Sequence, residues 1–199
     1  MMTRGAAVVG MAGTLLLCGT IAALTWAERD FMRGLGWHPI SAPTFDWPSG
    51  LALGPYGSVM EAAFIGSGIA MIVFSLGLQR GLARPEQRGG PTLLTLAGVA
   101  LVLLAFKTDP TLSRLPPTWH GRIHDAAFVL LGASLLPAML LLARRFRHDP
   151  AWRGHATYTL ATLLLAAPAF VLKGLAFYVF LVAMLLWIAL TAARLWRIR

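Results

Sequence analysis

The sequence has little charge and almost no cysteine. Only 13% of its 199 residues are charged, whereas a soluble domain of this length carries roughly a quarter. The single cysteine, Cys18, excludes an internal disulfide. The shortage of charge excludes an ordinary soluble globular domain. Together with a hydrophobic content of 57%, it predicts one polytopic membrane domain comprising residues 1–199.

Several catalytic motifs are also missing. The sequence contains no glycine-rich phosphate loop and no GxSxG nucleophile motif. It does not place histidines at mid-depth on facing helices, as a haem in a helical bundle requires. No acidic residue lies in the middle of the apolar segments 91–107, 156–172 and 174–195. This last absence counts against a proton or ion path through the protein.

Continuous apolar segments account for most of the chain. Each approaches the roughly 20 residues that a membrane-spanning helix needs, and none alternates with the period of two that is typical of barrel strands. A signal peptide that begins at Arg4 is the alternative for the first segment, but that run is long enough to span. We therefore predict an all-α bundle of six transmembrane helices, over about 5–26, 57–79, 91–107, 119–143, 156–172 and 174–195, with a long outer loop at 27–56.

The basic residues predict the orientation of this bundle. Eleven of the 17 Lys and Arg residues fall on the side that holds both termini, so the termini should be cytoplasmic in a bacterial inner membrane. Six of the eight acidic residues fall on the opposite, outer side, which leaves the whole formal charge of +9 facing the cytoplasm. Contact with anionic lipid headgroups explains this excess. Nucleic-acid binding is therefore not required.

The stretch "FKTDPTLSRLPPTWHGRIHD", residues 106–125, carries the most concentrated polar chemistry. Thr118 is a plausible helix N-cap, which places His120 and His124 one turn apart on one helical face. Two imidazoles at this spacing can share a zinc ion. Asp125 points about 100° away on the helix and can orient a histidine.

Further polar residues are expected at the same outer end. Each has a structural explanation: Ser58 and Glu61 have capping-box spacing, Asp109 precedes a proline as turn residues do, and Asp125 can pair with Arg122. Their convergence at one end of the bundle nevertheless indicates a functional site, because ionisable groups at membrane depth are costly. The additional candidates are Glu61, Asp109, His38 and Asp46.

The sequence resembles the prokaryotic membrane proteins grouped as domain-of-unknown-function family 998. The resemblance rests on "LGPYGSVMEAAFIGSG", "FKTDP", "HGRIHD" and the final "GLAFYVFLVAMLLWIALTAARL". It implies a six-helix integral membrane protein with no established activity. A polar and a basic residue are expected in this family where Phe177 and Tyr178 stand. A weaker likeness links "HGRIH" to alkaline-ceramidase-type hydrolases, which hold zinc with histidines; their third histidine has no clear counterpart here except His38.

Three functions are compatible with these observations. The first is a non-enzymatic accessory protein that binds lipids or another membrane protein subunit at its outer polar cluster. The second is a metal-dependent lipid hydrolase, in which His120 and His124 hold zinc, Asp109 or Glu61 is a third ligand or base, and Asp125 supports them. The third is a small transporter.

Overall fold

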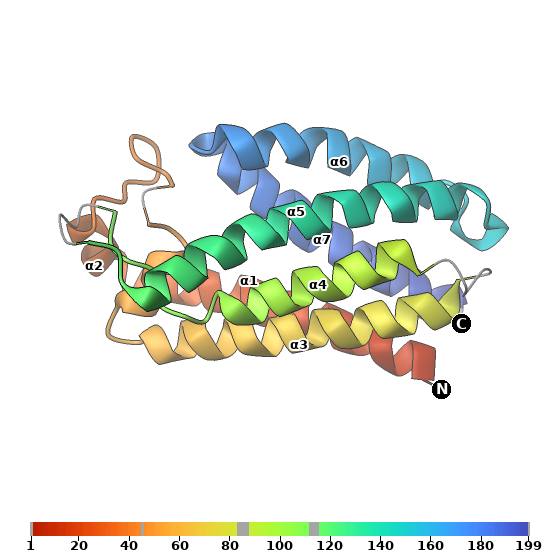
Figure 1. Cartoon of the computed structure of the whole chain (residues 1–199), viewed down its shortest axis with the longest axis horizontal. Helices are drawn as coiled ribbons and strands as arrows, with labels where there is room; N and C mark the ends of the chain where they lie inside the picture. The colour runs from red at the N-terminus through yellow and green to blue at the C-terminus, as the bar shows by residue number, and fades with distance from the viewer. Residues whose placement is uncertain (1, 45, 83–87, 112–115, 199) are drawn as a thin grey trace.

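The computed structural model describes residues 2–44, 46–82, 88–111 and 116–198, and within these ranges it is helical with no strand. Six long helices run along the molecule (Figure 1). They are α1 (Met2–Ala27), α3 (Gly57–Gly81), α4 (Gly89–Leu103), α5 (Trp119–Arg147), α6 (His155–Leu172) and α7 (Leu175–Ile198). Three short elements connect them: α2 (Arg29–Gly34), η1 (Ser49–Leu53) and η2 (Pro150–Trp152).

The long helices form a closed ring. Each packs against its neighbour in the chain, in the order α1, α3, α4, α5, α6 and α7, and α7 closes the ring against α1. The short connections after α3, α5 and α6 favour this arrangement, because they place consecutive helices side by side and antiparallel. The last two helices, α6 and α7, form a tight hairpin. Its turn consists of Lys173 and Gly174, which both adopt positive φ angles.

Five of the six long helices are long and apolar enough to cross a membrane. The sixth, α4, has only 15 residues. The sequence predicts this span at 91–107, but the helix begins earlier, at Gly89, and ends at Leu103, so Phe106 and Lys107 lie outside it. The other predicted spans match observed helices to within four residues at each end.

The two ends of the bundle differ in charge. One end, here called the arginine end, contains both termini, the last residues of α3 and α5, and the first residues of α4 and α6 (Figure 1). The described basic residues there are Arg4, Arg80, Arg88, Arg144, Arg145, Arg147, Arg153, Arg194 and Arg197, with Asp149 as the described acid. At the opposite end, here called the loop end, six described carboxylates face five described cations. Arg84, Glu86, Arg114 and Arg199 lie outside the described residues.

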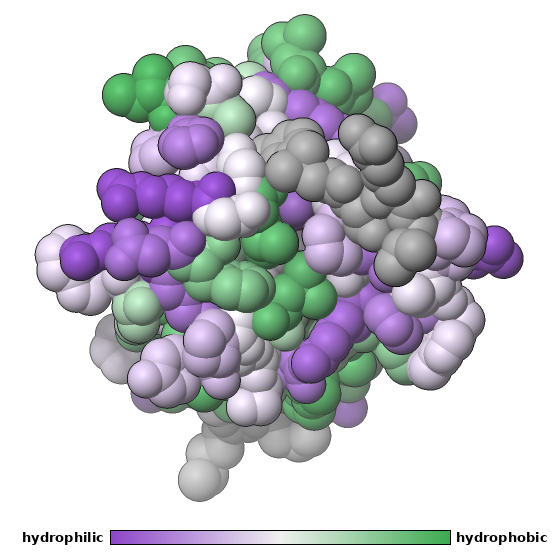
Figure 2. All heavy atoms as spheres, turned by 90° about the vertical axis from the view of Figure 1, so that its left-hand side faces the viewer, coloured by the Kyte–Doolittle hydropathy of each residue, from purple (hydrophilic) through white to green (hydrophobic). Residues whose placement is uncertain are grey.

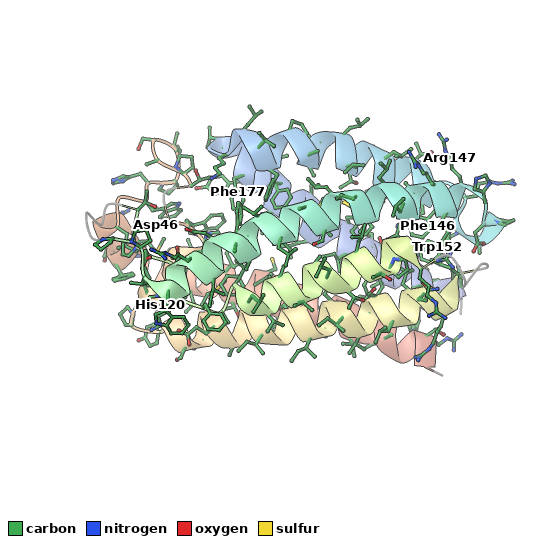
Figure 3. The ribbon with its side chains drawn as sticks, in the orientation of Figure 1. Asp46, His120, Phe146, Arg147, Trp152 and Phe177 are labelled. Carbon is green, nitrogen blue, oxygen red and sulfur yellow. The ribbon has the colours of Figure 1, made fainter. Side chains whose placement is uncertain are left out.

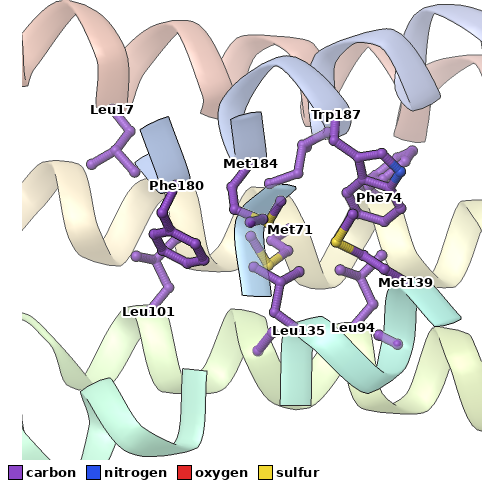
Figure 4. Packing of buried hydrophobic residues seen from close by; sticks show 14 of the residues in the cluster. Leu17, Met71, Phe74, Leu94, Leu101, Leu135, Met139, Phe180, Met184 and Trp187 are labelled. Atoms are coloured by element: carbon purple, nitrogen blue, oxygen red, sulfur yellow. The ribbon is translucent and has the colours of Figure 1, made fainter. Parts of the chain in front are cut away.

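Large apolar side chains from the surrounding helices pack together in the core (Figure 4). Phe74, Met139, Leu142 and Trp187 are all fully buried there. Small residues allow the helices to approach closely elsewhere. A Cβ atom on Gly98 of α4 would lie 2.9 Å from the carbonyl oxygen of Gly68 on α3. Such small-residue crossings are typical of helix packing within membranes.

Candidate functional site at the loop end

The carboxylate of Asp109 organises the start of α5. The backbone N–H of Thr118 donates to Asp109 Oδ2 (2.8 Å), and the Thr118 hydroxyl donates to Oδ1 (2.7 Å). Thr118 is the N-cap of α5, as the sequence predicts, and its Oγ1 accepts a hydrogen bond from the backbone N–H of Gly121. Asp109 thus caps α5 through Thr118. These hydrogen bonds, chiefly the one from the Thr118 hydroxyl, lower the pKa of Asp109 below its ordinary value of 3.8.

Gly121 makes room for this carboxylate. A Cβ atom at position 121 would lie 2.0 Å from Asp109 Oδ2 and 2.5 Å from its Cγ. No side chain fits there unless Asp109 moves away from Thr118. The glycine of the "HGRIHD" motif is therefore explained by the close approach of Asp109 to the first turn of α5.

His120 is held by the same cap. Its Nδ1 lies 2.9 Å from the carbonyl oxygen of Lys107 and 2.9 Å from Thr118 Oγ1. Because a carbonyl oxygen can only accept, Nδ1 carries the ring proton and donates to it. The ring therefore links the first turn of α5 to the end of the preceding loop. Figure 3 shows His120 at the loop end, on α5.

His124 is a buried latch between three elements. Its side chain is only 4% exposed. Nδ1 donates to the carbonyl oxygens of Leu104 (3.0 Å) and Phe106 (2.8 Å), and Nε2 of the neutral ring accepts from the Ser49 hydroxyl (3.0 Å). Since all its polar atoms are satisfied, His124 ties α5 to the end of α4 and to η1.

The 28–56 connection folds back over the loop end. The Tyr178 hydroxyl of α7 lies 2.9 Å from the carbonyl oxygen of Pro43, to which it donates. Trp37 donates to the same oxygen (2.7 Å), and its ring stacks on Trp47. Trp47 in turn donates to Thr25 of α1 (2.9 Å). The residues at which the sequence departs from the family pattern thus include a tyrosine that anchors this connection.

A polar pocket of about 160 Å³ lies between this connection and α5. Asp46, Ser49, Thr108, Thr111, His124, Asp125 and Lys173 form its polar wall, and Thr44, Trp47, Pro48, Phe128 and Phe177 complete the lining. We call it the loop-end pocket. Viewed onto this end, hydrophilic side chains surround a hydrophobic centre (Figure 2). Asp46 and Phe177 lie at this end of the bundle in Figure 3.

The two carboxylates of the pocket differ in availability. Asp46 accepts a hydrogen bond from the backbone N–H of Thr111 (3.0 Å) and another from the Thr111 hydroxyl. It thereby ties the 28–56 connection to the connection between α4 and α5. Asp125 is exposed and pairs with no cation among the described residues, Arg122 included. The ammonium group of Lys173 lies 5.7 Å from the centre of the Phe128 ring. The pocket therefore offers one carboxylate and one ammonium group to a ligand.

Beneath the pocket lies an apolar cavity of about 80 Å³, here called the core cavity. It is enclosed by apolar side chains from α1, α3, α4, α5 and α7, among them Leu101, Leu131, Leu181 and Met184. The pocket and the cavity share four lining residues, namely Pro48, Ser49, Phe128 and Phe177. A smaller void of about 20 Å³ continues toward Gly10 and Thr14. The site thus changes from polar to apolar with depth.

The remaining sequence candidates lie outside the pocket. Glu61 forms an ion pair with Lys107 (3.5 Å) on the surface. The expected capping box at Ser58 is absent, because α3 begins at Gly57 with Tyr56 as N-cap, and no side chain caps it. His38 is exposed in the 28–56 connection. Sequence reasoning missed the pocket roles of Trp47, Phe128 and Lys173, since none of these residues belongs to a recognisable motif.

The histidine pair has the geometry of two separate latches. The ring of His124 is fully engaged by backbone carbonyls and Ser49, whereas Nε2 of His120 makes no hydrogen bond to a described residue. Across the described part of the chain, no group of three or more His, Cys, Asp and Glu side chains is placed to hold a metal ion. A zinc ion on both histidines would have to displace Ser49 from His124. The metal-dependent hydrolase stays a hypothesis.

Comparison with known proteins gives one match. The profile of a family described as "Protein of unknown function (DUF998)" matches residues 17–194. No curated protein and no solved structure matches, so the weaker likeness to alkaline ceramidases also stays a prediction. The matched range contains the segments on which the resemblance rests, except the final Leu195, together with the lining residues of the loop-end pocket and the core cavity. The chain belongs to the DUF998 family.

Proposed function

We propose that the protein is a non-enzymatic, lipid-binding protein of the bacterial inner membrane. The lipid headgroup occupies the loop-end pocket, and the part of one acyl chain next to the headgroup enters the core cavity. The observation that carries this proposal is the adjacency of the two, which share Pro48, Ser49, Phe128 and Phe177 as lining residues. Ligand sites are commonly apolar cavities with a few convergent polar groups, and an amphiphile matches a site that is polar at its mouth and apolar inside.

The charges at the mouth suggest the headgroup. Asp125 presents a carboxylate and Lys173 an ammonium group to the same pocket. A zwitterionic headgroup places its amine near the first and its phosphate near the second. The hydroxyls of Thr44 and Thr108 also line the pocket and can bind the phosphate or ester oxygens. We therefore propose phosphatidylethanolamine as the ligand class.

Six spans with cytoplasmic termini complete the proposal. α3 ends at the arginine end and α5 begins at the loop end (Figure 1), so the chain between them traverses the bundle as α4. A 15-residue helix is only about 22 Å long, shorter than the hydrocarbon core of about 30 Å. The following turn at 104–106 extends the crossing. The arginine-rich end then faces the cytoplasm.

Native mass spectrometry of the detergent-purified protein tests lipid binding. Wild type should retain added phosphatidylethanolamine, and Leu181→Trp should lose it because the indole fills the core cavity. Val182→Trp is the matched control, because Val182 is 55% exposed on the outer face of α7. Equal retention by both variants would place the lipid outside the cavity and refute the proposal.

The headgroup assignment needs a separate comparison. The double variant Asp125→Asn/Lys173→Gln should weaken retention of phosphatidylethanolamine, whereas Arg122→Gln, on the exposed surface of α5, should not. C-terminal reporter fusions test the orientation. A green fluorescent protein fusion should fluoresce and an alkaline phosphatase fusion should be inactive, and the reverse pattern would invert the bundle.

A further inference from the structure

A second concave site lies at the arginine end, on the outside of the bundle between α3 and α4. It has a volume of about 440 Å³ and is distinct from the loop-end pocket. We call it the α3–α4 groove. Its polar lining consists of Ser75, Gln79, Arg80, Arg88, Thr92 and Thr95. The groove exists because α4 begins short of the adjacent ends of α3 and α5 (Figure 1).

Positive charge dominates this groove. Arg80 ends α3 and Arg88 directly precedes α4, and no carboxylate lies among the described lining residues. Two guanidinium groups that converge on one concave site favour a phosphate, which arginine recognises with paired donors.

The hydroxyl groups of the groove are arranged for a polar ligand. Thr95 donates to Ser75 Oγ (3.0 Å), and Ser75 donates to the carbonyl oxygen of Pro91 (2.5 Å). Both hydroxyl protons are therefore donated within the protein. Thr92 is exposed, and its hydroxyl makes no hydrogen bond within the described residues. It is therefore free to donate to an oxygen of the ligand.

An apolar surface continues from the groove toward the loop end. Ile69, Val73 and Leu76 of α3 follow one another at helical spacing and are 52%, 37% and 50% exposed. On α4, Leu96 and Val99 are 38% and 39% exposed. α3 and α4 pack directly against each other, so these exposed side chains form an apolar surface on the outer faces of the two helices. A ligand with a phosphate in the groove can lay hydrocarbon chains along this surface.

We infer that the α3–α4 groove is a binding site for an anionic phospholipid. The phosphate lies between Arg80 and Arg88 and accepts from the Thr92 hydroxyl, and the acyl chains follow the apolar surface of α3 and α4. Basic grooves between helices are suited to anionic headgroups on the cytoplasmic side of a membrane. This site is separate from the loop-end pocket, so either can exist without the other.

Native mass spectrometry with added phosphatidylglycerol tests this inference on the full chain. Arg80→Gln/Arg88→Gln should lower the affinity for phosphatidylglycerol by about 30-fold, since each arginine contributes about 1 kcal/mol. Arg153→Gln/Arg197→Gln is the matched control; it removes two charges from the same end at exposed positions outside the groove and should leave the affinity unchanged. Equal loss in both double variants would show a diffuse charge effect and overturn the site.

A variant that keeps every charge separates the groove from its arginines. Thr92→Trp should fill the groove and displace phosphatidylglycerol with Arg80 and Arg88 intact, and undiminished binding would refute the site. Added glycerol 3-phosphate should not displace the lipid at millimolar concentration, because it lacks acyl chains; displacement would make a soluble phosphate the ligand. Leu181→Trp, which tests the core cavity, should leave phosphatidylglycerol binding unchanged, so the two sites fail independently.

Discussion

Replacement of His124 by alanine should destabilise the protein much more than replacement of His120. The His124 ring is 4% exposed and satisfies three partners, the carbonyl oxygens of Leu104 and Phe106 and the hydroxyl of Ser49. Alanine removes the ring nitrogens and so leaves these three groups without their hydrogen-bond partner. His120 is half-buried, and its ring donates to the single carbonyl of Lys107, which is at the surface and can be hydrated.

The magnitude follows from the unsatisfied groups. A buried polar group without a partner costs about 1–3 kcal/mol. Since the two carbonyls share one donor, we expect His124→Ala to lower the free energy of unfolding by about 2–5 kcal/mol in total. For a chain of this size, each kcal/mol lowers Tm by about 2–4 °C. We therefore expect a Tm about 4–20 °C lower for His124→Ala, and a decrease of less than about 4 °C for His120→Ala.

Thermal unfolding followed by tryptophan fluorescence measures these shifts in detergent. His124→Asn is the matched rescue variant, because its amide nitrogen lies near the position of Nδ1 and can donate to a carbonyl. It should recover part of the loss. If His120→Ala lowers Tm as much as His124→Ala, and a chelator lowers the Tm of wild type alone by the same amount, the pair holds a metal and the latch account is wrong.

Three further predictions concern the loop end. Asp109→Asn should lower Tm at neutral pH. The pKa of Asp109 is depressed below 3.8 in the folded protein, so the ionised carboxylate stabilises the fold above that pH. The difference in Tm between variant and wild type should therefore vanish as the pH falls through the lowered pKa. Gly121→Ala should destabilise wild type but have a smaller effect in an Asp109→Ala background, since its Cβ meets that carboxylate, and additive Tm shifts would contradict this contact. Tyr178→Phe should lower Tm by a few degrees through loss of its hydrogen bond to Pro43. An unchanged Tm would show that the 28–56 connection is held by other contacts.

Much of the fold could be predicted from the sequence because long apolar runs have few alternatives. The helix boundaries at Gly57 and Trp119 agree with the structure. The end of α4 was harder to predict. Leu104, Ala105 and Phe106 continue the apolar run, but the chain leaves the helix there, and His124 of the next helix binds two of the freed carbonyls. A contact from a distant segment decided where α4 ends, and hydropathy does not contain that information.

The candidate site was only partly predictable. The polar stretch at 106–125 lies at the end of the bundle that contains the loop-end pocket, and His124 and Asp125 line that pocket. Most of the remaining lining residues belong to the 28–56 connection and to α7, which are distant from 106–125 in the sequence and come close to it only in the folded protein. Trp47 and Phe177 carry no motif that identifies them as pocket residues. Glu61 instead forms a surface ion pair with Lys107, and its position in the sequence does not predict this contact.

Photo-crosslinking tests the central claim most directly. Phosphatidylethanolamine with a diazirine near the carboxyl end of one acyl chain would be bound to the protein and irradiated, and its adducts would be located by peptide mass spectrometry. We predict adducts on cavity residues of α5 and α7 such as Leu131 and Leu181, with loss of these adducts in Leu181→Trp. Adducts confined to the exposed surface of α6, at Leu164 and Val171, would show that the lipid only surrounds the bundle and would contradict the account.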